Sequence, residues 1–282
     1  MWQSYTLWTI LRNMLHEVSE SPEAEARELL IAATGVHPFQ QPHHPIPQEA
    51  ISRLHHWVSL RKKGIPLAYI TGERAFLGLV FRVRPGVFIP RPDSEALVLQ
   101  AEELLKHHPA PHILDLGTGS GVLLLTLLHR LQRGRGVGVD RSLIALRTAR
   151  DNARRLGLQA RTRWPHCRAE RLPFQQVSFD LILANPPYVA GTHEMQGTDW
   201  KAEPPEALFA EEEGMAATRR WFQAAWPHLS AGGWILMESS AMRKHAVDQW
   251  LISQGLQPHW FRDTTGQWRG WGVQRPQEEG VP

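Results

Sequence analysis

Hydrophobic and polar positions change their spacing along this chain of 282 residues. In residues 1–72, apolar side chains recur every three or four positions, for example at Leu7, Leu11 and Leu15, as expected for amphipathic helices. The Ser-Pro-Glu sequence at 21–23 supplies the N-cap, the first position and the acidic first turn of a further helix. The pattern therefore predicts a small N-terminal helical domain over residues 1–72.

Residues 73–90 lack this helical spacing. Two apolar runs, 75–83 and 86–90, are interrupted by glycine and proline, which is typical of strands and turns. We therefore expect a β-hairpin that joins the helical domain to the rest of the chain. At the other end, residues 276–282 are polar and contain glycine and proline, so we expect a disordered tail there.

Residues 91–275 alternate between short apolar runs and helical spacing. Four apolar runs predict buried strands, at 112–116, 136–140, 181–184 and 234–238. Helices are expected at 123–131 and 143–156. Alternation of this kind predicts an α/β fold with a parallel, doubly wound, Rossmann-like sheet. Ligands of such sheets bind at the C-terminal ends of the strands, where the strand order reverses.

Composition narrows the class of protein. With 42% hydrophobic and 21% charged residues, the chain resembles an ordinary globular protein, and its net charge of +3 permits an RNA-associated partner without requiring one. Its single cysteine, Cys167, rules out an intrachain disulfide and a cysteine-based zinc site. The first residues lack the basic start and cleavage site of a signal peptide, and the apolar runs are too short to span a bilayer. We expect a cytoplasmic protein without membrane association or a bound metal.

A glycine-rich turn follows the first of these strands. Three glycines at alternate positions allow a sharp turn and close approach of a ligand to the backbone. Their G-x-G-x-G spacing differs from the G-x-G-x-x-G of dinucleotide sites, and Asp115 before them would repel a pyrophosphate. A carboxylate there suits the ammonium group of S-adenosylmethionine. Asp140, which ends the next strand, is placed to bind the ribose hydroxyls of an adenosine.

A second motif, Asn185-Pro186-Pro187-Tyr188, ends the strand at 181–184. Two prolines fix φ twice and push Asn185 out of the helical region, which predicts a stiff, extended turn. The Asn185 side-chain oxygen and the Pro186 carbonyl could accept hydrogen bonds from a planar amide or amino nitrogen, and Tyr188 could pack against that group. Positioning and electrostatics would then supply most of the rate, without a strong general base.

These motifs resemble those of the PrmC/HemK family of N5-glutamine methyltransferases, over nearly the whole chain. The matching segments are residues 66–72, 89–95, 115–121, 185–188 and 203–209. The resemblance implies methylation of the glutamine in the Gly-Gly-Gln tripeptide of class-1 peptide chain release factors, with an N-terminal domain that helps to hold the factor and S-adenosyl-L-homocysteine as product. It implies cofactor binding by Asp115, Gly117, Thr118, Gly119, Ser120, Gly121, Asp140 and Asn185. The implied acceptor-binding residues are Asn185, Pro186, Pro187 and Tyr188.

The chain departs from this family at three places. The acidic–aromatic pair that the family places at the adenine has no clear match in residues 164–170, and our alignment puts Cys167 or Arg168 there. Ser94 stands where the family usually has threonine, which keeps the hydroxyl. After the late strand, Glu238-Ser239 replaces the usual Glu-His.

Three alternatives remain at this stage. A sister family methylates a ribosomal protein and typically carries Arg-Ser-Pro where this chain has Arg91-Pro92-Asp93, so the release-factor branch is favoured. An adenine-N6 methyltransferase of nucleic acid would need a basic recognition surface, and no lysine-rich patch is present. A non-catalytic cofactor-binding protein would not need residues 185–188. We expect a monomer that forms no stable complex with nucleic acid.

Overall fold

The computed structural model describes residues 2–175, 177–192, 199–212 and 214–277. These residues fall into two compact units, 2–73 with 199–202, and 74–192 with 203–277. Most of the tail expected at 276–282 lies outside the described residues. Within the described parts, no helix combines the length and the hydropathy that a membrane span requires.

The N-terminal unit is helical, as its spacing predicts. Its helices are α1 (Ser4–Leu15), α2 (Pro22–Thr34), α3 (Gln48–Lys62) and α4 (Leu67–Thr71). The apolar stripe of α1 is buried through Leu7, Leu11 and Leu15, which pack with residues of α2 and α3. Arg61 of α3, only 6% exposed, ties the unit together through hydrogen bonds to Glu25 and Asp199.

A two-stranded hairpin follows, formed by β1 (Glu73–Phe76) and β2 (Leu79–Arg82). Positive φ at both turn residues, Leu77 and Gly78, gives a turn that matches the right-handed strand twist. The expectation of a strand at residues 86–90 was wrong. Its Ile89 N–H donates to a side chain, the Glu203 carboxylate, at 2.8 Å, and so takes no part in a strand ladder.

The large unit contains a seven-stranded sheet with the order β5-β4-β3-β6-β7-β9-β8. Its strands are β3 (His112–Leu116), β4 (Arg135–Val139), β5 (Thr162–Arg163), β6 (Phe179–Ala184), β7 (Leu229–Glu238), β8 (His259–Arg262) and β9 (Trp268–Gln274). The pairs from β5 to β7 are parallel, as predicted, but β9 is antiparallel to both β7 and β8. The short connection between β8 and β9 leaves room only for an antiparallel pair.

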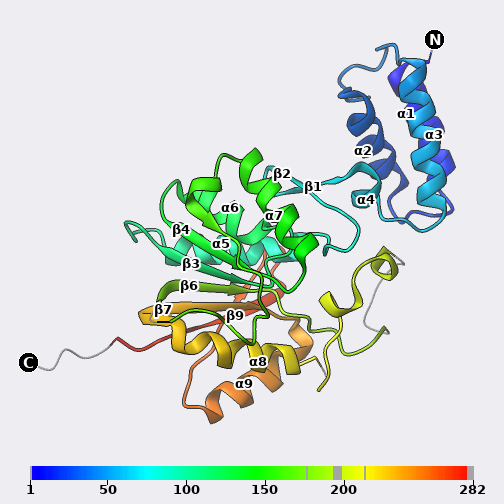
Figure 1. Ribbon diagram of the computed structural model, residues 1–282. Helices are drawn as coiled ribbons and strands as arrows, with labels where there is room; N and C mark the ends of the chain where they lie inside the picture. Colours follow the sequence, from blue (N-terminus) through cyan, green and yellow to red (C-terminus); the bar gives the residue numbers. More distant parts are fainter. Residues whose placement is uncertain (1, 176, 193–198, 213, 278–282) are drawn as a thin grey trace, which may run out of the picture. The chain divides into compact units, whose positions relative to one another are not determined.

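Helices cover both faces of this sheet, with α5 to α7 on one side and α8 and α9 on the other (Figure 1). The helices are α5 (Glu95–Leu104), α6 (Val122–Leu131), α7 (Leu143–Arg155), α8 (Ala216–Ala225) and α9 (Lys244–Ser253). Short 3-10 turns are η1 (Pro92–Ser94), η2 (Gln159–Arg161), η5 (Pro205–Ala207), η6 (Trp226–His228) and η7 (Ala241–Arg243), with η4 (Asp199–Ala202) in the helical unit. Successive residues of a strand point to opposite faces of the sheet and so pack in different hydrophobic cores. In β6, Leu183 packs in one core, and Ile182 and Ala184 pack in the other.

Strand order reverses at β3, which lies between β4 and β6. Leu116 at the end of β3 pairs with Ala184 of β6, and Ala184 pairs with Met237 of β7. The residues that come next, Asn185 and Glu238 among them, therefore meet at one edge of the sheet. This edge is where doubly wound sheets bind their ligands.

Candidate active site

The glycine-rich turn connects β3 to α6 at this edge. Gly117, Gly119 and Gly121 all have positive φ, between 56° and 80°, which a residue with a Cβ rarely adopts. A Cβ at Gly117 would lie 2.5 Å from the ring of Trp221, whereas a Cβ at Gly119 would meet only the Gly117 carbonyl oxygen, at an ordinary contact distance of 4.0 Å. Gly119 is therefore needed for the backbone conformation of the turn. Gly117 is needed for that conformation and also for the close approach of the Trp221 ring.

Asp115 lies beneath this turn with no exposed surface. Its Oδ2 accepts a hydrogen bond from the Thr118 hydroxyl at 2.5 Å, and its Oδ1 makes no close hydrogen bond within the described residues. Burial is the main cause that raises the pKa of Asp115 to about 7, and the nearby Asp140 carboxylate raises it too. A positive charge bound above the turn would favour the ionised form.

Asp140 follows the last residue of β4, as the sequence predicts for a ribose-binding carboxylate. Its two oxygens accept hydrogen bonds from backbone amides, Gly119 N at 2.9 Å and Ser142 N at 2.8 Å. These bonds couple the turn after β3 to the start of α7. Burial is the main cause of the raised pKa of Asp140, and the backbone hydrogen bonds oppose it.

A cavity of about 380 Å³ opens over the turn, which is large enough for a small cofactor. Of the predicted cofactor residues, six line it: Gly117, Thr118, Gly119, Ser120, Asp140 and Asn185. Asp115 and Gly121 do not. Asp115 lies below the turn. A Cβ at Gly121 would lie 3.1 Å from Ala149, so this glycine lets the start of α6 pack closely against α7.

The wall beyond Asp140 contains residues that the sequence did not single out. Ala169 and Glu170 line the cavity, and neither Cys167 nor Arg168 does. Trp221 of α8 lines it too, and its indole N–H donates to the Glu170 carboxylate at 3.1 Å. An acidic and an aromatic side chain thus occur together here, although they are 51 residues apart in the chain. Local spacing could not reveal this pair.

The Asn-Pro-Pro-Tyr motif leaves the end of β6 and separates this cavity from a second one of about 180 Å³. All four motif residues line the second cavity, and Asn185 and Pro187 line both. Asn185 Nδ2 donates to the Ser94 hydroxyl at 3.2 Å, whereas Oδ1 makes no hydrogen bond with any described residue. The side-chain oxygen of Asn185 is therefore available to a ligand.

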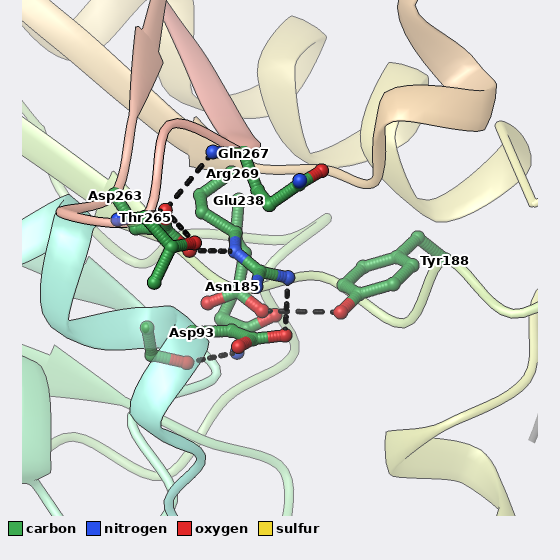
Figure 2. Close-up of polar contacts among 9 residues, drawn as sticks. Asp93, Asn185, Tyr188, Glu238, Asp263, Thr265, Gln267 and Arg269 are labelled. Carbon is green, nitrogen blue, oxygen red and sulfur yellow. Dashed lines mark hydrogen bonds and ion pairs between the residues drawn. The ribbon is translucent and has the colours of Figure 1, made fainter. Parts of the chain in front are cut away.

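Tyr188 is anchored through its hydroxyl, which donates to Oε1 of Glu238 at 3.2 Å (Figure 2). Glu238, at the end of β7, is 3% exposed, and its burial raises its pKa to about 7. The pKa of Tyr188 is also well above its ordinary value because of burial and the neighbouring carboxylate. The sequence indicated no role for Glu238, because its partner is 50 residues away in the chain.

Two further motifs meet through one buried carboxylate. Glu203 accepts a hydrogen bond from Ile89 N and forms an ion pair with Arg91, and its side chain is inaccessible to solvent. The segment that precedes Ser94 is thereby held against the segment that begins at Glu203. Phe88 and Ala207, from these two segments, line both cavities.

Comparison with known families and proteins gives consistent matches. Residues 7–72 match the family described as "PrmC N-terminal domain", and residues 78–202 match "Methyltransferase small domain". A release factor glutamine methyltransferase of Bradyrhizobium diazoefficiens is 36% identical over 245 residues, which is 84% of this chain and 82% of the relative. The enzyme of the same name from Bordetella pertussis is 39% identical over 213 residues, 73% of this chain and 76% of its own.

Solved structures resemble the fold at lower identity. A 16S rRNA methyltransferase (RsmC) of T. thermophilus, in complex with AdoMet and guanosine, has a TM-score of 0.53 at 20% identity, covering 72% of this chain and 49% of its own. A methyltransferase from Pyrococcus furiosus has a TM-score of 0.51 at 15% identity, covering 82% and 100%. These likenesses show a methyltransferase fold, and the sequence matches go further: the chain belongs to the family of release factor glutamine methyltransferases.

Proposed function

We propose that this protein transfers a methyl group from S-adenosyl-L-methionine to N5 of the glutamine in the Gly-Gly-Gln tripeptide of class-1 peptide chain release factors. The observation that carries the proposal is the position of Asn185, whose side chain borders both cavities. A cofactor in one cavity and an amide in the other would meet at this residue. The relatives that share 36–39% identity with the chain carry the corresponding name.

The larger cavity fits S-adenosylmethionine, which supplies a methyl group activated by a positively charged sulfur. The backbone from Gly117 to Ser120 would border its amino-acid part, with the negative charge of Asp115 below the turn. Asp140 would accept hydrogen bonds from the ribose hydroxyls. Trp221 and Glu170 would supply an aromatic face and a hydrogen-bond acceptor for the adenine, with the acidic member at the end of residues 164–170 and the aromatic member from α8.

The smaller cavity fits the planar side chain of glutamine. An amide nitrogen is a poor nucleophile because its lone pair is delocalised into the carbonyl group. Asn185 Oδ1 and the Pro186 carbonyl would each accept one N–H of that nitrogen and hold it for attack. As the methyl carbon leaves the sulfur, which becomes the neutral thioether of S-adenosyl-L-homocysteine, and bonds to the nitrogen, the nitrogen would become acidic and lose one proton to water, so no strong base is needed. The rate would come mainly from this positioning.

The remaining expectations belong to the same proposal. The helical unit would help to hold the release factor while its glutamine loop enters the site. Because the proposed substrate is a translation factor, we expect the protein to act in the cytoplasm. We expect it to act as a monomer and without a stable nucleic-acid complex, since its net charge is only +3.

The test is mass spectrometry of a purified class-1 release factor after incubation with this protein and isotopically labelled S-adenosylmethionine. We expect one labelled methyl group on the glutamine of the Gly-Gly-Gln peptide. A release factor in which that glutamine is replaced by glutamate is the control and should gain no label. Cofactor binding is measured in parallel by isothermal titration calorimetry.

Each other outcome has a definite meaning. Label on a different residue would refute the proposed acceptor. If the cofactor binds but the release factor gains no label, the proposed substrate is wrong, and a ribosomal protein and adenine-containing nucleic acid are then tested as acceptors. Failure to bind the cofactor would refute the proposed occupant of the larger cavity.

A further inference from the structure

The orientation of the Asn185 amide decides whether it can bind an acceptor amide. Its side chain has an oxygen that accepts hydrogen bonds at one end and an NH₂ group that donates them at the other. The nitrogen to be methylated carries N–H groups, so it needs the oxygen of Asn185. Rotation of the amide by 180° would turn the NH₂ group of Asn185 toward the N–H groups of the acceptor, and two hydrogen-bond donors cannot bind each other. The interactions of Nδ2 therefore bear directly on catalysis.

The partner of Nδ2 is the Ser94 hydroxyl, which is 2% exposed. A hydroxyl can accept and donate, so by itself Ser94 could bind either end of the Asn185 amide. It has a single hydrogen, however. If that hydrogen is given to another acceptor, only the lone pairs of the hydroxyl are left for Asn185, and these bind Nδ2 but not Oδ1.

The buried Glu238 carboxylate would take this hydrogen. Its Oε1 already accepts from Tyr188, and its buried Oε2 makes no close hydrogen bond within the described residues. The Ser94 hydroxyl lies near enough to lower the pKa of this carboxyl. An ionised carboxylate only accepts hydrogen bonds, so it can bind the Ser94 hydroxyl in one direction alone.

We propose that Ser94 and Glu238 are positioning residues that fix the amide of Asn185 with its oxygen toward the acceptor nitrogen. The Glu238 carboxylate draws the Ser94 hydrogen, and the Ser94 oxygen then holds Asn185 Nδ2. The same carboxylate holds the Tyr188 hydroxyl, so both ends of the motif at 185–188 are set by one group. This inference rests on the proposed function, since it assigns Asn185 Oδ1 to the glutamine amide.

The surroundings of Glu238 hold this arrangement in place (Figure 2). Arg269 of β9 pairs with Asp93, the residue before Ser94, at 2.5 Å, and with Asp263 in the turn before β9 at 2.6 Å. The segment that carries Ser94 is thereby anchored to the edge of the sheet. Two of these charges act on the pKa of Glu238, which Asp93 raises and Arg269 lowers.

Protonation of Glu238 would remove the constraint. A neutral carboxyl has a hydrogen of its own and could donate it to Ser94, which frees the Ser94 hydrogen for Asn185 Oδ1. Because the pKa of Glu238 is raised to about 7, this change falls near neutral pH. Turnover at saturating cofactor should therefore decline as the pH is lowered through 7.

The test compares Ser94→Thr with Ser94→Val, which have the same shape and differ in the hydroxyl. We expect kcat of Ser94→Thr to stay within about twofold of wild type, and kcat of Ser94→Val to fall by about five- to tenfold, the effect of one neutral hydrogen bond. The dissociation constant of S-adenosylmethionine should be the same for both variants. Thr126→Val, which removes a buried hydroxyl in the middle of α6, is the control and should keep wild-type kcat.

Equal kcat for the two Ser94 variants would overturn the inference. Should Ser94→Val not fold, as judged by thermal denaturation, Glu238→Gln decides: its amide offers one acceptor for two hydroxyls and does not titrate. For Glu238→Gln we expect a kcat below that of wild type, and this kcat should not decline as the pH is lowered through 7. A pH profile of kcat identical to that of wild type would refute the role of Glu238. Wild-type protein that transfers no methyl group would instead contradict the proposed function.

Discussion

Two buried carboxyl groups lie at the same edge of the sheet, Asp115 beside the cofactor cavity and Glu238 beside the acceptor cavity. Burial raises the pKa of each to about 7. In each, one oxygen accepts from a hydroxyl, that of Thr118 or Tyr188, and the other makes no close hydrogen bond within the described residues. Their immediate environments are thus closely alike.

The charged residues around Asp115 differ from those around Glu238. Asp115 is influenced by a second carboxylate, Asp140, which raises its pKa further. Glu238 is influenced by Asp93 and also by Arg269, whose positive charge lowers its pKa. Among the described residues, no cation acts on the pKa of Asp115, although Arg141 and Arg220 line the cofactor cavity, so the negative charge beneath the turn suits a positively charged ligand. The acceptor side is partly neutralised by the protein itself, which suits an uncharged amide.

Asn185→Ala should distinguish the acceptor side from the cofactor side most clearly. Loss of the side-chain oxygen removes a hydrogen bond to the reacting nitrogen, so kcat should fall by about 10²- to 10³-fold, as for other groups that stabilise a transition state. Cofactor affinity should change little, because the turn and Asp140 are untouched. Radiometric turnover assays and calorimetry measure the two quantities, and equal losses in both would remove the distinction.

Asp140→Ala tests the cofactor side. Loss of a charged acceptor for the ribose hydroxyls should weaken S-adenosylmethionine binding by about 10- to 100-fold. The variant also leaves Gly119 N and Ser142 N without their partner, so thermal denaturation must accompany calorimetry. Turnover at saturating cofactor should be close to that of wild type. Unchanged affinity in a folded variant would mean that the ribose lies elsewhere.

Trp221→Ala asks whether the wall beyond Asp140 contributes to the cofactor side. Loss of an aromatic face and of its hydrogen bond to Glu170 should weaken cofactor binding by about tenfold. Trp2→Ala, at an exposed position in the helical unit, is the matched control and should bind normally. Titration followed by tryptophan fluorescence should also show a smaller signal change in Trp221→Ala alone. Normal affinity would exclude Trp221 from the site.

The smallest expected effect is a pH dependence of cofactor affinity through Asp115. With a pKa of about 7 in the free protein, affinity should fall by about twofold from pH 8 to pH 7, because a positively charged ligand favours the ionised form. The stability of the folded protein should depend on pH in the opposite direction. The folded state holds this proton more tightly than the unfolded state, so the stability of the free protein should decrease as pH rises through 7. Asp115→Asn should abolish both dependences, and their persistence would assign them to another group.

Much of the site was visible in the sequence because its elements are local. The turn at 115–121 and Asp140 follow successive strands, and both strands could be identified from apolar runs. Asn185–Tyr188 follows a third strand, β6, which is adjacent to β3 in the sheet. Parallel strands bring such loops to one edge, so spacing and fold class together predict that they meet.

The remainder depends on contacts between residues far apart in the chain. Ser94 and Asn185 are 91 residues apart, and Trp221 and Glu170 are 51 apart. No periodicity connects such pairs. The error at residues 86–90 has the same origin, since an apolar run that resembles a strand gives the N–H of Ile89 to Glu203, 114 residues away.

The wall shared by the two cavities bears on inhibitor chemistry. Phe88, Asn185, Pro187 and Ala207 border both spaces, so a single compound could occupy both at once. In such a bisubstrate ligand, a nucleoside portion and an amide portion would be joined past Asn185. Each portion would raise the effective concentration of the other, and the affinity of the pair would exceed that of either part without any new contact.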